Sequence, residues 1–223
     1  MEQRQAEILK TIIESYLDRA VPVASSYLAD HKNFDISSAT IRHEMGELES
    51  NGYIEQPHTS AGRIPTIKGI NFYIDHLMTE SRLTDKECQH FETTVHNDGV
   101  KALAREIAGM CQAAVIITQN ETDYYYTGLS HLFRQPEFVN TDMIITIGDA
   151  VDHLESMLPH FTRETIGAAP MIFIGKNNPL GKEFAAVFIS NTHAHPTYCG
   201  LISPVRTNYA YNVAVLAAVA NYL

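Results

Sequence analysis

Apolar residues recur every three or four positions along residues 2–19, and this spacing places them on one side of an α-helix. The apolar positions are Ile8, Leu9, Ile12, Ile13, Tyr16 and Leu17. Val21-Pro22-Val23 interrupts the pattern, and Ser25 is the expected N-cap of a short second helix with Tyr27, Leu28 and Ala29. The chain is therefore predicted to begin with one long and one short helix.

A third helix is predicted from Ser37, a suitable N-cap, to about Ser50, where Asn51-Gly52 supplies a C-terminal stop. At 100° per residue, the side of this helix that contains Ile41 also contains Met45, Leu48 and Ser37, and we expect this side to be buried. The opposite side then carries Ala39, His43, Gly46 and Ser50, with Thr40 and Arg42 on the flanks. Three helices within residues 2–50 are typical of a helix-turn-helix.

Two short extended segments, residues 53–56 and 63–65, flank a polar loop at 57–62 that contains Gly62. This pattern predicts a β-hairpin of the kind called a wing. Thr66 is the expected N-cap of a fourth helix, which carries Ile67, Ile70, Ile74 and Leu77. The preferred boundary follows at residues 81–84, so we predict a winged helix-turn-helix domain at residues 1–80.

Residues 81–223 mix helical and strand patterns. Two helices are predicted to meet near Asn97-Asp98-Gly99, and two more are predicted at 141–158 and 208–223. Strands are predicted at 113–117, 124–126, 171–174, 185–190 and 197–202. The chain is therefore assigned to the α+β class, with helices on a small antiparallel sheet in its second domain.

The exposed side of the third helix suits the major groove of DNA, because small residues allow close approach to base edges and polar residues can read them. Arg42 is the best candidate for a bidentate contact to guanine or for a phosphate contact. On pattern alone, an ordinary solvent-facing helix side is the alternative. The adjoining loop favours the DNA interpretation because it concentrates hydrogen-bond donors. The predicted DNA-binding residues are Ser38, Ala39, Thr40, Arg42, His43, Gly46, His58, Thr59, Ser60 and Arg63.

The charge balance does not favour nonspecific adhesion to nucleic acid. The chain has a formal net charge of -10, and residues 1–80 contain seven Lys and Arg against twelve Asp and Glu. Neutralisation of phosphates supplies most of the sequence-independent affinity for DNA. Any DNA-binding face must therefore be built locally, and binding should depend steeply on correct base and phosphate contacts.

Little in the sequence points to catalysis, a cofactor or a metal. None of the motifs G-x-S-x-G, G-x-x-x-x-G-K-[ST], H-E-x-x-H and G-x-G-x-x-G occurs. His193-Ala194-His195 with Cys199 is the best metal-like cluster, but solvated strand-edge histidines are the more common explanation. Cys88, Cys111 and Cys199 are expected to be ordinary buried thiols. We therefore predict that the protein is not an enzyme and has no cofactor and no metal site.

The sequence also argues against a membrane or secreted location. It contains no run of about 18 uncharged apolar residues, the length needed to span a bilayer. The first ten residues are charged and periodic, unlike a secretory signal. A cytoplasmic location is expected.

Residues 37–78 resemble the signature segment of a bacterial family, the heat-inducible transcription repressors (HrcA family). The wing sequence PHTSAGR-x-PT is intact from Pro57 to Thr66. The resemblance continues at Thr127-Gly128-Leu129-Ser130, at Gln135-Pro136-Glu137-Phe138 and at residues 200–206, Gly-Leu-Ile-Ser-Pro-Val-Arg. It therefore covers both ends of the chain.

The resemblance implies a repressor of heat-shock (chaperone) genes that binds an inverted-repeat DNA operator as a homodimer and releases it on heat stress. Each winged helix would take one half-site, and the chaperonin would be a further partner. In the family a GAF-like domain follows, interrupted by an inserted dimerising domain. For residues 81–223 the resemblance implies linker helices and a reduced GAF-like regulatory and dimerisation domain.

The chain departs from the family pattern at several points. Only residues 118–127 separate Ile117 from Gly128, so the inserted domain is expected to be absent and the resemblance leaves the dimer geometry open. His43 stands where the family usually has Asn, and Ala24-Ser25-Ser26 replaces a Gly-Ser-Lys type of helix start. Two alternatives remain: a ligand-sensing GAF-like regulator of a different regulon, and a shortened relative that represses genes other than chaperone genes.

Overall fold

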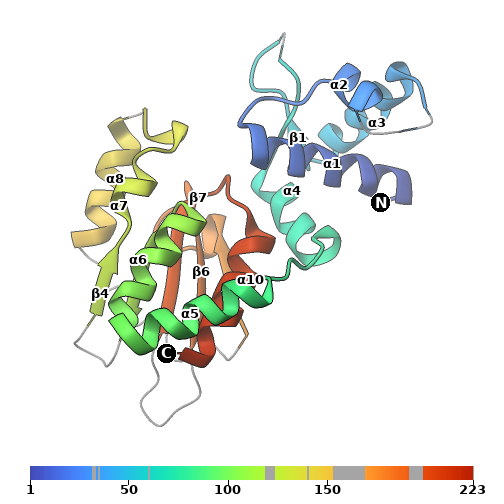
Figure 1. Ribbon diagram of the computed structural model, residues 1–223. Helices are drawn as coiled ribbons and strands as arrows, with labels where there is room; N and C mark the ends of the chain where they lie inside the picture. Colours follow the sequence, from blue (N-terminus) through green and yellow to red (C-terminus); the bar gives the residue numbers. More distant parts are fainter. Residues whose placement is uncertain are drawn as a thin grey trace. The chain divides into compact units, whose positions relative to one another are not determined.

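The computed structural model describes residues 1–31, 34, 36–59, 61–118, 124–139, 141–152, 169–190 and 198–222. The chain divides into two compact units, Met1–Thr79 and Glu80–Leu223 (Figure 1). Each unit has its own hydrophobic core, and each is described by itself.

The first unit begins with three helices, α1 (Gln3–Arg19), α2 (Ser25–His31) and α3 (Ser38–Ser50). All three were predicted. Glu2 caps α1 through a reciprocal capping box with Gln5. Ser37 caps α3, since its hydroxyl accepts a hydrogen bond from the backbone N–H of Thr40 at 3.2 Å.

The core of the first unit is the apolar side of these helices. Its most deeply buried side chains come from α1, α2, α3 and the residue that begins the first strand, and they are Ile8, Leu9, Ile12, Ile13, Leu28, Ile41, Leu48 and Ile54. One detail of the prediction was wrong. Ser37 is exposed and does not lie on the buried side of α3, because its hydroxyl is used at the cap. Tyr16 and Leu17 are half-buried and pack against this core, in agreement with the apolar spacing.

A two-stranded antiparallel sheet follows the helices. It pairs β1 (Ile54–Glu55) with β2 (Ile64–Pro65). Thr66 caps α4 (Ile67–Phe72) by accepting from the N–H of Gly69 at 3.1 Å, as predicted. The expected single helix changes after α4 to a π-helix, η1 (Tyr73–Leu77).

The second unit contains a five-stranded, fully antiparallel sheet with the strand order β4-β3-β7-β6-β5. Its strands are β3 (Ala114–Thr118), β4 (Tyr124–Thr127), β5 (Met171–Ile174), β6 (Phe184–Ser190) and β7 (Tyr198–Pro204). Each corresponds to a predicted strand. β3 and β4 pair directly with each other, and residues 119–123 alone separate them in the chain.

Helices cover both faces of this sheet (Figure 1). One face packs against α5 (Asp85–Asp98), α6 (Val100–Cys111) and α10 (Tyr209–Val219). The other packs against α7 (Leu129–Leu132), the 3-10 helix η2 (Pro136–Val139) and α8 (Thr141–Asp152). The short 3-10 helices η3 (Gly175–Asn177) and η4 (Ala220–Tyr222) complete the unit. The protein is thus a mixed helix and sheet structure, consistent with the predicted α+β class.

Alternate residues of β3 enter different cores, because successive side chains of a strand point to opposite faces of the sheet. Val115 and Ile117 pack with α5, α6 and α10, whereas Ala114 and Ile116 pack with α7 and α8. Burial on both faces explains why the strand reads as a continuous apolar run.

The cysteines differ in their surroundings. Cys111 and Cys199 are buried in one core cluster, and burial raises the pKa of each thiol to about 12, with a further contribution to Cys199 from nearby Cys111. Both are therefore protonated, unreactive thiols near neutral pH. Cys88 is only half-buried, so the prediction of three buried thiols was wrong for this residue.

Candidate nucleic-acid interface

Helix α3 presents its predicted polar face to solvent. Ala39, Arg42 and His43 are exposed, whereas Ile41, Met45 and Leu48 are 0%, 4% and 1% exposed. The three other candidates on this helix, Ser38, Thr40 and Gly46, are half-buried. A methyl group built on Gly46 would meet nothing within 4 Å, so the surface beside Gly46 is open.

Two of these candidates also stabilise the start of the helix. The hydroxyl groups of Ser37 and Thr40 lie 3.0 Å apart, and those of Ser25 and Ser38 lie 3.4 Å apart. The second contact joins α2 to α3, the two helices that make up the predicted helix-turn-helix. The structure therefore fixes the N-terminal turn of α3 through small hydroxyl groups.

A part-buried ion pair, which the sequence patterns did not reveal, attaches α3 to α1. Glu44 is 6% exposed, and its Oε1 atom accepts from Arg4 at 2.9 Å from Nε. The second nitrogen of Arg4 lies 2.8 Å from the same oxygen. Glu44 lies three residues after Ile41, and this helical spacing was the available signal that it shares the buried side.

Arg42 is distinguished from the other basic residues of this unit. Among the Lys and Arg residues that the structure describes in Met1–Thr79, Arg42 alone has no ion pair, hydrogen bond or aromatic contact from its side chain to a described residue. The others contact Glu44 (Arg4), Glu14 and Thr79 (Lys10), the Tyr27 ring (Arg19), Glu49 (Arg63), and the Asn51 carbonyl and Tyr53 ring (Lys68). The guanidinium group of Arg42 is thus available for an external ligand.

The loop between β1 and β2 holds the remaining candidates. His58 and Thr59 are exposed, whereas Ser60 lies outside the described residues. The guanidinium group of Arg63 contacts Glu49 of α3 at 2.9 and 3.0 Å. The structure therefore brings the α3 candidates together on one helix side and turns Arg63 toward that helix.

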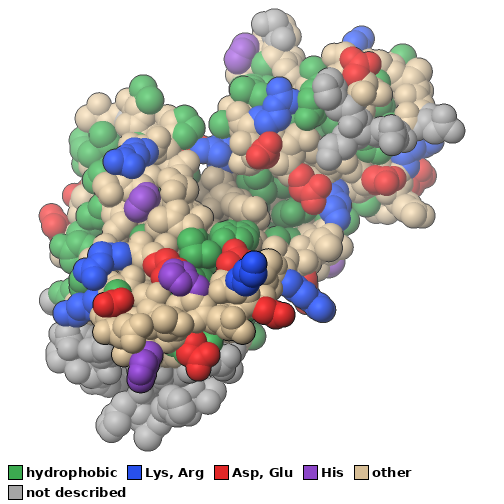
Figure 2. All heavy atoms as spheres, viewed as in Figure 1, with side chains coloured by type: hydrophobic (Ala, Val, Ile, Leu, Met, Phe, Trp, Pro, Cys, Tyr) green, Lys and Arg blue, Asp and Glu red, His purple; other side chains and the backbone are tan. Residues whose placement is uncertain are grey.

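The surface charges are mixed. On the face shown in Figure 2, Lys and Arg side chains are interspersed with Asp and Glu, and the described residues form no broad basic area there. This distribution agrees with the acidic composition of the chain. A DNA contact would have to rely on a few well-placed groups.

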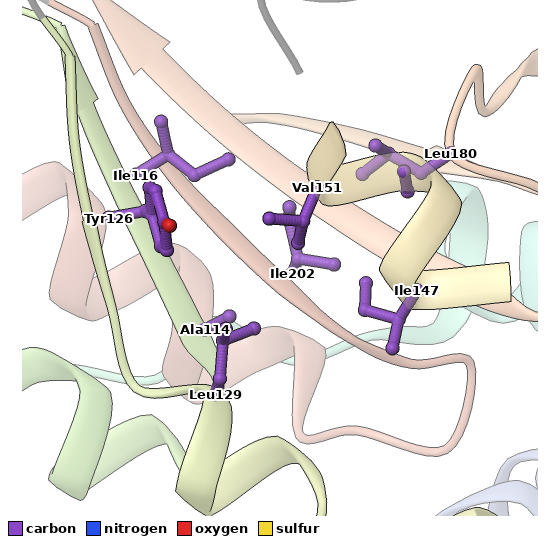
Figure 3. Close-up of a pocket in the computed structure, with 9 residues that line it drawn as sticks. Ala114, Ile116, Tyr126, Leu129, Ile147, Val151, Leu180 and Ile202 are labelled. Atoms are coloured by element: carbon purple, nitrogen blue, oxygen red, sulfur yellow. The ribbon is translucent and has the colours of Figure 1, made fainter. Parts of the chain in front are cut away.

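An apolar pocket lies between α8 and the sheet of the second unit (Figure 3). Ile147 and Val151 of α8 point toward Ile202 of β7, and the phenol of Tyr126 brings the only side-chain oxygen among the lining residues described. The lining consists of Ala114, Ile116, Tyr126, Leu129, Ile147, Ala150, Val151, Leu180 and Ile202. Such a lining favours an apolar ligand or none.

A part-buried ion pair joins two of the segments that resembled the repressor family. Arg206, which follows β7, donates from Nε to Oε1 of Glu137 in η2 at 2.5 Å. Its terminal nitrogen donates to Oε2 of Glu137 at 3.2 Å and to Oε1 of Gln135 at 3.0 Å. The side chains of Arg206 and Glu137 are 12% and 23% exposed, and this part-buried contact connects the η2 segment to the end of the sheet.

Neither a metal site nor a membrane-spanning helix occurs among the residues that the structure describes. The described residues contain no group of three or more His, Cys, Asp or Glu placed to hold a metal ion. His193 and His195 of the metal-like cluster lie outside the described residues, and Cys199 is buried in the core. In the part of the chain that the structure describes, no helix has the length and apolar character to cross a bilayer.

Comparison with known proteins places the chain in a family. Residues 73–213 match the family model described as the HrcA protein C terminal domain. Because this match covers more than half of the chain, the chain belongs to the HrcA family. Curated members of similar sequence are named heat-inducible transcription repressor HrcA.

Three of these relatives illustrate the extent of the similarity. The Chlorobium chlorochromatii protein is 53% identical over 89 residues, which cover 40% of this chain and 26% of that protein. The Natranaerobius thermophilus protein is 42% identical over 125 residues, or 53% and 36% of the two chains. The Halalkalibacterium halodurans protein is 33% identical over 171 residues, or 72% and 48%. The chain thus spans less than half the length of each of these relatives.

A solved structure supports the fold. A crystal structure of a hypothetical protein superimposes with a TM-score of 0.81 and 21% sequence identity, covering 100% of this chain and 98% of the other. At this level of identity the similarity shows a shared fold alone.

Proposed function

We propose that the chain is a DNA-binding repressor of heat-shock (chaperone) genes. In this proposal the first unit is a winged helix-turn-helix, α3 is its recognition helix, and the β1–β2 hairpin is its wing. The second unit is a reduced GAF-like regulatory and dimerisation domain. The protein acts in the cytoplasm, binds an inverted-repeat operator as a homodimer, and releases it on heat stress. Family membership supports the repressor function.

The observation that carries the DNA-binding part is the exposed side of α3. It combines small residues, an open surface beside Gly46, and the unpartnered guanidinium group of Arg42. The major groove of B-DNA admits one α-helix, and an Arg side chain pairs with both acceptors of guanine. We therefore assign base or backbone contacts on α3 to Ser38, Ala39, Thr40, Arg42, His43 and Gly46. His58, Thr59 and Ser60 of the wing are assigned to the flanking backbone, with Arg63 at its base.

Replacement of Arg42 tests this assignment. Arg42→Ala is expected to weaken operator binding by about 1–3 kcal/mol, because it removes a charged bidentate donor, while thermal stability stays unchanged. The measurement is a fluorescence-anisotropy titration with the inverted-repeat duplex obtained by in-vitro selection on the unmodified chain. Arg105→Ala, at an exposed position on α6, is the matched control. Equal affinity of the Arg42 variant and the control would reject α3 as the reading helix.

Self-association is supported by apolar side chains at the surface of the second unit. All of its described large hydrophobic residues that are exposed fall within residues 126–145, and Figure 2 shows hydrophobic side chains at the surface on the side of α7 and α8. They are Tyr126, Phe133, Val139, Ile144 and Ile145. An inverted repeat matches a two-fold symmetric dimer, so we propose that a second copy covers this surface.

Two acidic residues on α8 would disrupt such a dimer. Ile144→Glu combined with Ile145→Glu is expected to yield a monomer in light scattering coupled to size-exclusion chromatography, because burying unpaired carboxylates is costly. Operator affinity should also fall, because a monomer binds a single half-site and loses the gain in affinity from binding both half-sites at once. Gln89→Glu combined with His96→Glu adds the same charge at exposed positions of α5 and should leave the dimer intact. A dimer that persists in the α8 variant would place the interface elsewhere.

One alternative is a ligand-sensing regulator of a different regulon, in which an apolar ligand would bind at the pocket between α8 and the sheet. Thermal-shift measurements with apolar metabolites, set against titration with the operator duplex, distinguish the two functions. We also propose a chaperonin as a partner, and family membership alone supports this.

A further inference from the structure

The guanidinium group of Arg63 is bound within the first unit. Its Nε atom donates to Oε2 of Glu49 at 3.0 Å, and a terminal nitrogen lies 2.9 Å from the same oxygen. The side chains of Arg63 and Glu49 are 21% and 34% exposed. Because Glu49 lies in the last turn of α3 and Arg63 precedes β2, this contact joins the candidate recognition helix to the base of the wing.

The backbone at the same place is fixed on its other side. Val23 and Arg63 exchange both backbone hydrogen bonds, each at 2.8 Å. A Cβ atom at Gly62 would lie 2.4 Å from the carbonyl oxygen of Val23, so glycine permits this close approach. The base of the wing is therefore held between the segment before α2 and the end of α3.

A second side chain sets the shape of the wing loop from inside. The Nε2 amide of Gln56 donates to the carbonyl oxygens of Thr59 and Ala61, each at 3.0 Å. The N–H of Ala61 also donates to the carbonyl oxygen of His58 at 2.9 Å. Both amide protons of Gln56 are thus used to hold the loop that carries His58 and Thr59.

We propose that Glu49, Arg63 and Gln56 are positioning residues that hold the wing in its DNA-binding orientation relative to α3. This inference rests on the proposed DNA-binding function. Arg63 acts through Glu49 and not as a phosphate contact, and Gln56 acts through the loop backbone. A loop that is already ordered loses less conformational entropy on binding, so these contacts determine operator affinity without touching the DNA. The guanidinium group of Arg63 also offsets the negative charge of the Glu49 carboxylate, which would otherwise repel the phosphates of DNA.

The competing role for Arg63 is that it leaves Glu49 and binds a phosphate. The two roles predict opposite effects for Glu49→Ala. If Arg63 binds phosphate, the substitution frees its guanidinium group and removes a negative charge, so affinity rises. If the pair positions the wing, affinity falls even though the chain becomes less acidic. Glu47→Ala removes the same charge from an exposed position of α3 that does not contact Arg63, and it is the matched control.

The experiment titrates the full chain and its variants with the selected inverted-repeat duplex at several salt concentrations. Glu49→Ala, Gln56→Ala and Arg63→Ala are each expected to weaken binding roughly tenfold relative to Glu47→Ala, the size of one well-placed contact. The slope of log Kd against log salt should not change. A loss of about 0.9 from that slope in Arg63→Ala, or tighter binding by Glu49→Ala than by Glu47→Ala, would overturn the proposal.

A charge exchange keeps the test decisive if a single variant unfolds. Glu49→Arg combined with Arg63→Glu restores the ion pair with its members reversed, and binding is expected to recover to within a few-fold of the unmodified chain. If Arg63 contacts phosphate, the exchanged chain carries an acid at that position and binding does not recover. Failure of the unmodified chain to select any duplex would instead reject the proposed function itself.

Discussion

Arg206→Ala is expected to lower the free energy of unfolding of the second unit by about 2 kcal/mol, because it removes hydrogen bonds to a charged, part-buried carboxylate. The substitution removes the hydrogen-bond donor of the Glu137 carboxylate, which is 23% exposed. It also removes the donor to the Oε1 atom of Gln135. Both groups lose a charged hydrogen-bond donor. The loss should free the η2 segment from the end of β7, since these contacts join the two.

Chemical denaturation followed by circular dichroism measures this effect. Arg134→Ala is the matched control, because Arg134 is an exposed arginine close in sequence to Glu137. The control should change stability by less than about 0.5 kcal/mol, as is usual for surface substitutions. If Arg206→Ala behaves like the control, the contact is a surface pair of little energetic weight. A double variant with Glu137→Ala should be less damaging than the sum of the single changes, because removing both partners leaves no stranded charge.

The sequence predicted the helices of the first unit and one face of α3 because these features depend on local periodicity. Ile41, Met45 and Leu48 return to one side at helical spacing, and Ser37 supplies a cap within three residues. The strands of the second unit were predicted for a similar reason, since branched and aromatic runs are long enough to recognise. The prediction of β5 at Met171–Ile174 matches the structure.

Ionic partners were not predictable in this way. Glu44 pairs with Arg4, which is 40 residues away in the sequence, and Arg206 pairs with Glu137 across 69 residues. No local pattern specifies which charges meet after folding. Arg63 is an example, because its contact with Glu49, 14 residues earlier in the sequence, could not be predicted from the loop pattern. The contacts of Gln56 are local, to Thr59 and Ala61, but they depend on the conformation of the loop, which the sequence pattern did not specify.

Short or irregular helices were also missed. Helix α7 comprises Leu129–Leu132 and η2 comprises Pro136–Val139, each too short to show a period. The π-helix at Tyr73–Leu77 differs from an α-helix by one residue in its hydrogen-bond spacing. Its Tyr73 is buried beside Glu14, and burial with that carboxylate raises the pKa of the phenol to about 12. A tertiary environment of this kind leaves no mark in the sequence of the helix itself.

Gly69→Ala is expected to destabilise the first unit by at least about 3 kcal/mol, the upper part of the range for overpacking. A Cβ atom at this position in α4 would lie 2.0 Å from the carbonyl oxygen of Tyr53. That oxygen cannot move away freely, because it accepts hydrogen bonds from the backbone N–H of Thr66 at 3.1 Å and from its hydroxyl at 3.2 Å. The substitution should therefore disturb the junction between the wing and α4, and operator binding should be lost with it.

Gly46→Ala is the control, and its expected effect on the free energy of unfolding is opposite to that of Gly69→Ala. Gly46 lies within α3 with open space around its Cβ position, so Gly46→Ala should stabilise the helix by up to about 1 kcal/mol. It should nevertheless weaken operator binding, because the added methyl group stands on the face proposed to approach the base edges. Thermal unfolding and duplex titration of both variants separate these effects. A stable Gly69→Ala protein would contradict the packing argument, and a Gly46→Ala protein that binds the duplex undiminished would contradict the placement of α3 in the groove.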